Sequence, residues 1–130
     1  MVLKVILDTN ALMLPFESGF NLQFAVQSAL AGEMGYSLIV PEPMLDELRR
    51  LSRKGRWEAK AALKMVEGKG LPVEIMATER RGDGAILELI ERLGRDDVVV
   101  FTNDRELIKI LKGSRVRLMR LRGKGHLEME

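Results

Sequence analysis

Long apolar runs alternate with one-faced amphipathic segments along this chain. The runs at residues 2–7 and 98–101 are almost entirely apolar, which is typical of strands buried on both faces of a parallel sheet. Shorter β-like runs cover residues 37–40 and 71–76. Polar and apolar positions alternate over residues 116–121, which predicts a strand at the edge of the sheet. The pattern therefore predicts about five strands.

Apolar residues between these runs recur at helical spacing. Leu22, Ala25, Val26 and Ala29 fall at i, i+3, i+4 and i+7, which predicts a helix with one apolar face. Similar patterns predict four further helices, at residues 43–53, 57–67, 83–93 and 105–112. Strands that alternate with helices indicate βαβ units with right-handed crossovers. The predicted fold class is α/β, a three-layer α/β/α sandwich around a mostly parallel sheet.

Length and composition fit one folded domain. A chain of 130 residues, 46% hydrophobic and 31% charged, has a globular composition and can bury one core. We expect one domain over residues 1–130, with a basic and acidic C-terminal tail at 122–130 that is able to move. The chain has no cysteine, which excludes disulfides and thiolate sites and suits the cytoplasm. No segment approaches the ~20 apolar residues of a membrane span.

Four acidic residues stand where the predicted topology brings segments together. Asp8 and Asp104 follow the two long apolar runs, and ligands of open parallel sheets bind beyond the carboxyl ends of the strands. Glu47 borders the buried stripe of its predicted helix, whereas Asp46 points away from it. Asp83 lies at the start of the predicted helix at residues 83–93, beside the buried stripe of that helix. We therefore expect these four carboxylates, without Asp46, to share one cleft.

Each of these positions has a structural alternative when it is considered alone. An aspartate before a helix is a preferred N-cap, which applies to Asp8, Asp83 and Asp104, and Glu47 fits a solvated helix residue. Their joint occurrence favours a metal site instead. Carboxylates are hard oxygen donors that repel one another unless a cation such as Mg²⁺ or Mn²⁺ neutralises them. Neutral hydrogen-bonding residues that could orient such ligands accompany two of the acids.

Basic residues cluster although the net charge is only +2. One cluster spans residues 49–56 and another spans 115–124. Such patches can follow a phosphate backbone, and a solvated surface is the alternative for each. The basic side chains expected to contact substrate phosphates are Arg49, Arg53, Arg80, Arg81, Arg122 and Lys124.

Four motifs, VILDTNALM, VPEPMLDELRRL, GDGAILELIERL and VVVFTNDRELIKIL, follow one another over nearly the whole chain. In this order and spacing they resemble the PIN-domain ribonucleases, and the closing VRLMRLRGKGHLEM resembles archaeal members of the branch that processes ribosomal RNA. The resemblance implies a Rossmann-like sandwich and an endoribonuclease that depends on Mg²⁺ or Mn²⁺. It places the acidic quartet at Asp8, Glu47, Asp83 and Asp104.

The same resemblance implies partners and supporting residues. Asn10 and Thr102 match polar positions around the quartet. A homodimer is implied, and VapC-type toxins of the family are held by an antitoxin protein. Gly84 departs from the family pattern, in which a further acid often stands at this position. Asp8 is the expected central ligand, and whether one or two ions bind stays open.

Two other functional classes remain open. A non-catalytic RNA-binding or assembly module could keep the same fold and basic patches. A receiver-like signalling domain also places acids at strand ends, but it needs a lysine on a late strand that has no match here. His126 is the only histidine and lies in a basic segment near the C-terminus. This excludes multi-histidine zinc sites, and no serine or thiol pairs with it in a triad.

Overall fold

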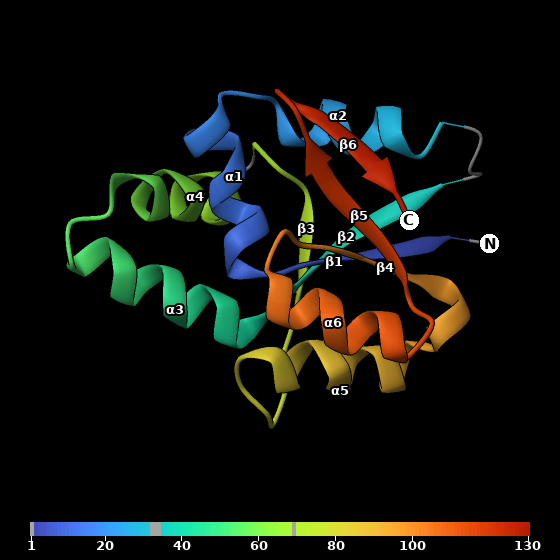
Figure 1. The fold of residues 1–130 in the computed structure, drawn as a ribbon. Helices are drawn as coiled ribbons and strands as arrows, with labels where there is room; N and C mark the ends of the chain where they lie inside the picture. The colour runs from blue at the N-terminus through green and yellow to red at the C-terminus, as the bar shows by residue number, and fades with distance from the viewer. Residues whose placement is uncertain (1, 32–34, 69) are drawn as a thin grey trace.

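The centre of the protein is one mixed sheet with the strand order β3-β2-β1-β4-β5-β6 (Figure 1). It is seen in a computed structural model that describes residues 2–31, 35–68 and 70–130. The first five strands are parallel, and β6 is antiparallel to β5. The strands are β1 (Leu3–Leu7), β2 (Tyr36–Pro41), β3 (Val73–Met76), β4 (Val98–Phe101), β5 (Arg117–Arg122) and β6 (His126–Met129).

Helices cover both faces of this sheet, which confirms the predicted α/β/α sandwich (Figure 1). The first four helices pack on one face and the last two on the other. They are α1 (Thr9–Ser18), α2 (Leu22–Ala29), α3 (Glu42–Arg53), α4 (Trp57–Glu67), α5 (Asp83–Leu93) and α6 (Arg105–Gly113), and a 3-10 turn, η1 (Arg95–Asp97), precedes β4. The sequence pattern assigned no helix to α1, which contains Pro15 and begins directly after β1.

The prediction that β5 lies at the edge of the sheet is wrong. β6 covers its outer side, with Leu121 opposite Leu127 and Arg122 opposite His126. Only Leu127 of β6 is buried, so the short strand has almost no apolar pattern by which the sequence could reveal it. The turn before it contains Gly123 and Gly125 at φ 64° and 68°. β6 therefore lies within the segment 122–130 that was expected to be a tail.

The register of the two central strands brings the ends of β1 and β4 together. Leu7 lies opposite Phe101 in the parallel pair, so the residues that follow them, Asp8 and Thr102, leave the sheet side by side. Every residue of β4 is buried. The strand order also reverses between β1 and β4, because β2 and β3 lie on one side and β5 on the other. Ligands of open α/β sheets bind at such a switch point.

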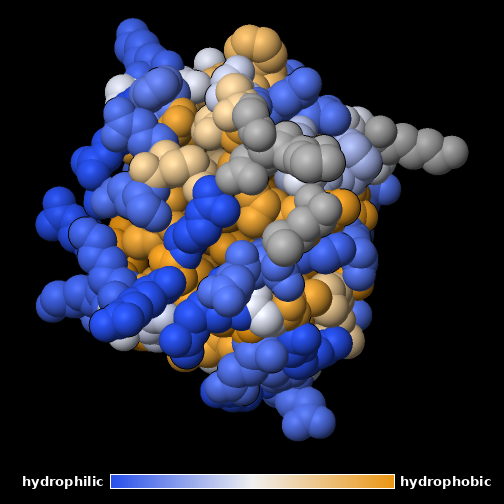
Figure 2. All heavy atoms as spheres, turned by 90° about the vertical axis from the view of Figure 1, so that its right-hand side faces the viewer, coloured by the Kyte–Doolittle hydropathy of each residue, from blue (hydrophilic) through white to orange (hydrophobic). Residues whose placement is uncertain are grey.

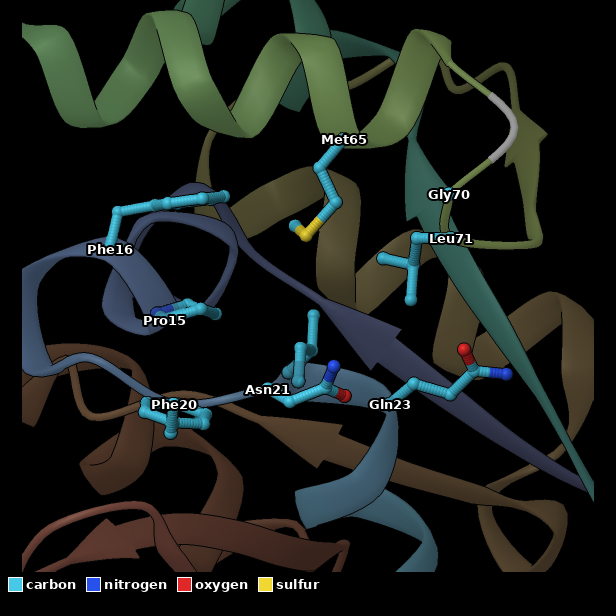
Figure 3. Close-up of a pocket in the computed structure, with 9 residues that line it drawn as sticks. Pro15, Phe16, Phe20, Asn21, Gln23, Met65, Gly70 and Leu71 are labelled. Atoms are coloured by element: carbon cyan, nitrogen blue, oxygen red, sulfur yellow. The ribbon is translucent and has the colours of Figure 1, made fainter.

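The rest of the surface is mixed. At the amino ends of the parallel strands, hydrophilic side chains surround smaller hydrophobic areas (Figure 2). An apolar hollow of about 220 Å³ lies at the C-terminal end of α1, where Met65 and Leu71 face Pro15 and Phe16 (Figure 3). It is at the end of α1 opposite Asp8. None of the described helices is long and apolar enough to cross a membrane.

Candidate metal centre

Asp8 is a buried acid fixed between two hydrogen-bond donors. It is 7% exposed, it caps the N-terminus of α1, and its Oδ1 accepts the backbone N–H of Ala11 at 2.7 Å. The Thr102 hydroxyl donates to its other oxygen at 2.5 Å. Burial raises the Asp8 pKa from 3.8 to about 6, against the lowering effect of these hydrogen bonds, and the charges of Asp104 and Asp83 raise it further. Among the described residues, no lysine or arginine forms an ion pair with Asp8.

Thr102 connects Asp8 to the next acid. Its oxygen also accepts the backbone N–H of Asp104 at 3.0 Å, and Thr102 is fully buried. Asp104 caps α6, where its Oδ1 accepts the N–H groups of Glu106 and Leu107 at 2.9 and 3.1 Å. Its Oδ2 accepts no hydrogen bond from the described residues. One hydroxyl thus sets the relative position of two carboxylates, as the expected supporting role of Thr102 requires.

Asn10 fixes the loop that carries Thr102 and Asp104. Its side-chain oxygen accepts the backbone N–H of Asn103 at 3.1 Å. The Asn103 amide in turn bonds both backbone groups of Leu121 on β5, at 2.8 and 3.2 Å. The loop after β4 is therefore tied to α1 on one side and to β5 on the other.

Asp83 and Glu47 complete the cluster from two further helices. Asp83 is exposed in the first turn of α5, after Gly82, and its side chain makes no capping hydrogen bond. Partial burial raises its pKa, as do the charges of Asp104, Glu106 and Glu47, in that order. Glu47 is half-buried on α3.

The N-cap alternative holds for two of the three aspartates. Asp8 and Asp104 both cap their helices, whereas Asp83 does not. Capping leaves Asp104 with an unused oxygen, so a cap at this site can also be a ligand. Glu106, one turn into α6, is an acid that the sequence analysis did not single out, although it faces Asp83 closely enough to raise its pKa. Its position two residues after Asp104 was the available clue.

The donor chemistry of this cluster fits a hard divalent cation. All of its side chains offer carboxylate oxygens, and within the described residues none of Asp8, Glu47, Asp83 and Asp104 forms an ion pair with a lysine or arginine. No three acidic side chains in residues 2–31, 35–68 and 70–130 are close enough to form a ready-made metal-binding group. The charges of neighbouring carboxylates raise the pKa values of Asp8 and Asp83, but the oxygens of the cluster are not close enough to coordinate one ion as they stand.

Comparison with known proteins identifies the family of the chain. Residues 5–124 match the model of a family described as a PIN like domain. The chain belongs to the PIN-like domain family. It is 28% identical over 129 residues to "Ribonuclease VapC4" of Methanocaldococcus jannaschii, a match that covers 97% of this chain and 95% of that protein. A solved structure titled "Structure of the PIN domain endonuclease Utp24" aligns with a TM-score of 0.78 at 18% identity, over 98% of this chain and 90% of the other.

The PIN-like fold separates the basic residues into different environments. Arg49 bridges Asp46 at 3.3 Å and Glu67 at 3.0 Å, so it links α3 to α4. Arg80 pairs with Glu88 and Glu91. These partners show that Arg49 and Arg80 have structural contacts; whether either also meets RNA stays a prediction.

The other predicted contacts are exposed. Arg81 pairs with Asp46 at 3.1 Å beside a hollow that Glu47 also lines. Arg53 ends α3. Arg122 ends β5 and pairs with Glu128 and Glu130, and Lys124 lies in the turn before β6. Arg81 thus lines a hollow together with Glu47, an acid of the cluster.

Proposed function

We propose that this protein is an endoribonuclease that uses Mg²⁺ or Mn²⁺ bound by Asp8, Glu47, Asp83 and Asp104. One observation carries the proposal: at the switch point of a PIN-like fold, burial and then the charges of neighbouring carboxylates raise the pKa of Asp8 and of Asp83, and neither has a basic partner among the described residues. Enzymes place such destabilised charges where a ligand compensates them. The relatives described above, a ribonuclease and a PIN domain endonuclease, support RNA cleavage.

Asp8 is the proposed central ligand because it is the most rigidly held of the four. It follows a buried central strand, and both of its oxygens are oriented by hydrogen bonds. The unused oxygen of Asp104 and the uncapped carboxylate of Asp83 would complete the site. A bound divalent cation would acidify a water molecule and neutralise charge on the scissile phosphate. Binding would have to draw the exposed carboxylates toward Asp8, since they form no ready-made group.

Glu47 has a different proposed role. It lies on α3, it is half-buried, and its charge raises the pKa of Asp83 less than those of Asp104 and Glu106 do. Its carboxylate can accept a hydrogen bond from the attacking water or contribute to a second ion. Thr102 and Asn10 hold the loop and the two strand-end acids in place, so they are proposed as positioning residues.

A cleavage assay tests this proposal. Purified protein is incubated with single-stranded RNA in Mg²⁺, Mn²⁺ or EDTA, beside Asp8→Asn and the control Asp96→Asn, which alters an exposed acid in η1. We expect internal cleavage by the parent and the control with either ion. EDTA removes the ion from solution, and Asp8→Asn removes its proposed central ligand. Each should therefore reduce the rate of cleavage at least 100-fold. Unchanged cleavage in Asp8→Asn would refute the role of Asp8, and RNA binding without any cleavage would favour a non-catalytic module.

The partner predictions belong to the same proposal. Phe24 and Trp57 are 72% and 60% exposed, which is unusual for large hydrophobic side chains and agrees with a homodimer or an antitoxin contact. Light scattering of the purified protein separates a monomer from a dimer. A small reading frame beside the gene would favour a toxin held by an antitoxin, and its absence would favour a role in RNA maturation.

A further inference from the structure

A hollow of about 240 Å³ lies directly beside the acidic cluster. Its lining comes from α3 and from the loop before α5, and consists of Pro43, Asp46, Glu47, Arg50, Arg81 and Gly82. The hollow is partly open to solvent, so a hydrated phosphate group can enter it. Gly82 contributes no side chain to it, and its φ of 58° favours glycine at this position. The hollow thus joins one proposed metal ligand to two arginines.

Arg50 has the features of a side chain held ready for a ligand. It is exposed, it lies three residues after Glu47 on α3 and so on the same side of the helix, and it forms no hydrogen bond or ion pair with the described residues. Arg49, its neighbour, has two carboxylate partners. The guanidinium of Arg50 therefore keeps all of its donors for a group that enters from solvent.

Arg81 is held in place from two directions. Its Nη2 donates to Asp46 at 3.1 Å, which leaves its other N–H groups unused. The loop before it is fixed by Glu88, whose carboxylate accepts the backbone N–H groups of Glu79 and Arg80 at 2.9 to 3.1 Å. The Glu88 side chain is itself only 15% exposed, so it holds the loop from a mostly buried position. An anchored arginine loses less freedom when it binds a phosphate.

The charges in the hollow suit an anion once the proposed cation is bound. Asp46 is shared by Arg49 and Arg81, so its charge is already compensated. Glu47 is the remaining acid, and it belongs to the cluster that raises the pKa of Asp83. With Glu47 compensated by a cation, the positive charge of Arg50 has no carboxylate partner among the described residues, and Arg81 still offers the N–H groups that Asp46 does not accept. Planar guanidinium groups match the oxygens of a phosphate better than lysine does.

We infer that Arg50 and Arg81 together bind the RNA backbone phosphate next to the one that is cleaved, in the hollow beside Glu47. The inference rests on the proposed function, because it places an RNA strand that runs from the acidic cluster over the first turns of α3 and α5. Arg50 and Arg81 are positioning residues. Arg80 is left out, since its side chain is turned toward Glu88 and Glu91.

RNA binding measured without cleavage tests this inference. A fluorescently labelled single-stranded oligoribonucleotide is titrated with full-length protein in EDTA and in Ca²⁺, from 50 to 300 mM salt. The variants are Arg50→Gln, Arg81→Gln, Arg50→Lys and the double glutamine variant. The matched control is Arg95→Gln, since Arg95 is also an exposed arginine that forms no ion pair with the described residues, but it lies in η1 before the amino end of β4, whereas Asp8 follows the carboxyl end of β1.

In Ca²⁺, each glutamine variant should raise the Kd about threefold to tenfold and lower the slope of log Kd against log salt by about 0.7, the value for one phosphate contact on a single strand. Arg50→Lys should keep the slope, and Arg95→Gln should change the Kd less than about twofold. Melting curves check that the variants fold. An unchanged salt slope for Arg50→Gln, or an equal loss in Arg95→Gln, would overturn the inference even if the parent cleaves RNA. Failure of the parent to cleave, with these binding effects intact, would refute the proposed function instead.

Discussion

Asp8→Asn should make the metal-free protein more stable at alkaline pH, although it removes the proposed central ligand. Asp8 is 7% exposed, and its pKa rises from 3.8 to about 6 on folding. Each unit of difference between the folded and unfolded pKa corresponds to about 1.36 kcal/mol, so the charged side chain lowers the free energy of unfolding by about 3 kcal/mol. An acid with a raised folded pKa binds more protons in the folded state. The cost is therefore absent below pH 3.8, grows as pH rises to about 6, and is complete above it.

Asparagine keeps the size of aspartate and removes the charge. Its oxygen can still accept the N–H of Ala11, but it cannot accept a second hydrogen bond from Thr102 at the position of Oδ2, a loss of about 1 kcal/mol. The net change should be a gain of about 2 kcal/mol at pH 8 and a loss of about 1 kcal/mol near pH 4. Such a gain at a proposed active site is the usual relation between stability and function.

Urea unfolding in EDTA from pH 4 to pH 8 measures this difference. The control Asp96→Asn removes an exposed acid in η1 and should change the free energy of unfolding by less than about 0.5 kcal/mol throughout. The reasoning is refuted if Asp8→Asn is no more stable than the parent at pH 8, or if its difference from the parent is the same at both ends of the range. Either result would mean that Asp8 is compensated in the folded protein.

Two further predictions concern the same carboxylates. Millimolar Mn²⁺ should raise the Tm of the parent by about 8 °C if the ion is present at 100 times its Kd, because it binds only the folded state. Asp8→Asn should lose most of this rise. An unchanged melting curve would count against a site that forms in the folded protein. Thr102→Val should lower the free energy of unfolding by about 1–3 kcal/mol and raise the Asp8 pKa further, because Asp8 loses a donor and the Asp104 N–H loses its acceptor, whereas Thr102→Ser should behave like the parent in urea unfolding.

The parts of the fold that bury continuous apolar runs could be predicted from the sequence. β1 and β4 are almost fully buried on both faces, so their residues leave no alternative to a central strand. α1 escaped prediction because Pro15 interrupts the usual helical composition, and its residues are buried nearly all round, so no polar face marks it. β6 escaped because its contribution to the core is one leucine, Leu127. A strand such as β6 forms because it pairs with β5, and the local sequence pattern holds no information about that pairing.

The candidate site was accessible for a different reason. Strand ends and helix faces place Asp8, Asp104 and Glu47 without knowledge of the tertiary structure, and the structure brings them into electrostatic contact through Asp83. The hydrogen-bond partners of the arginines could not be predicted from the sequence. Arg80 and Arg81 are adjacent in sequence, yet their side chains go to different acids, because α3 and α5 approach the loop from two sides.

The central claim is that these carboxylates bind a divalent cation in one pocket, and anomalous diffraction from crystals soaked in Mn²⁺ tests it most directly. The account predicts a manganese peak within coordination distance of a carboxylate oxygen of Asp8 and of Asp83 or Asp104, and no such peak in Asp8→Asn crystals treated in the same way. Manganese bound elsewhere, with these oxygens uncoordinated, would contradict it.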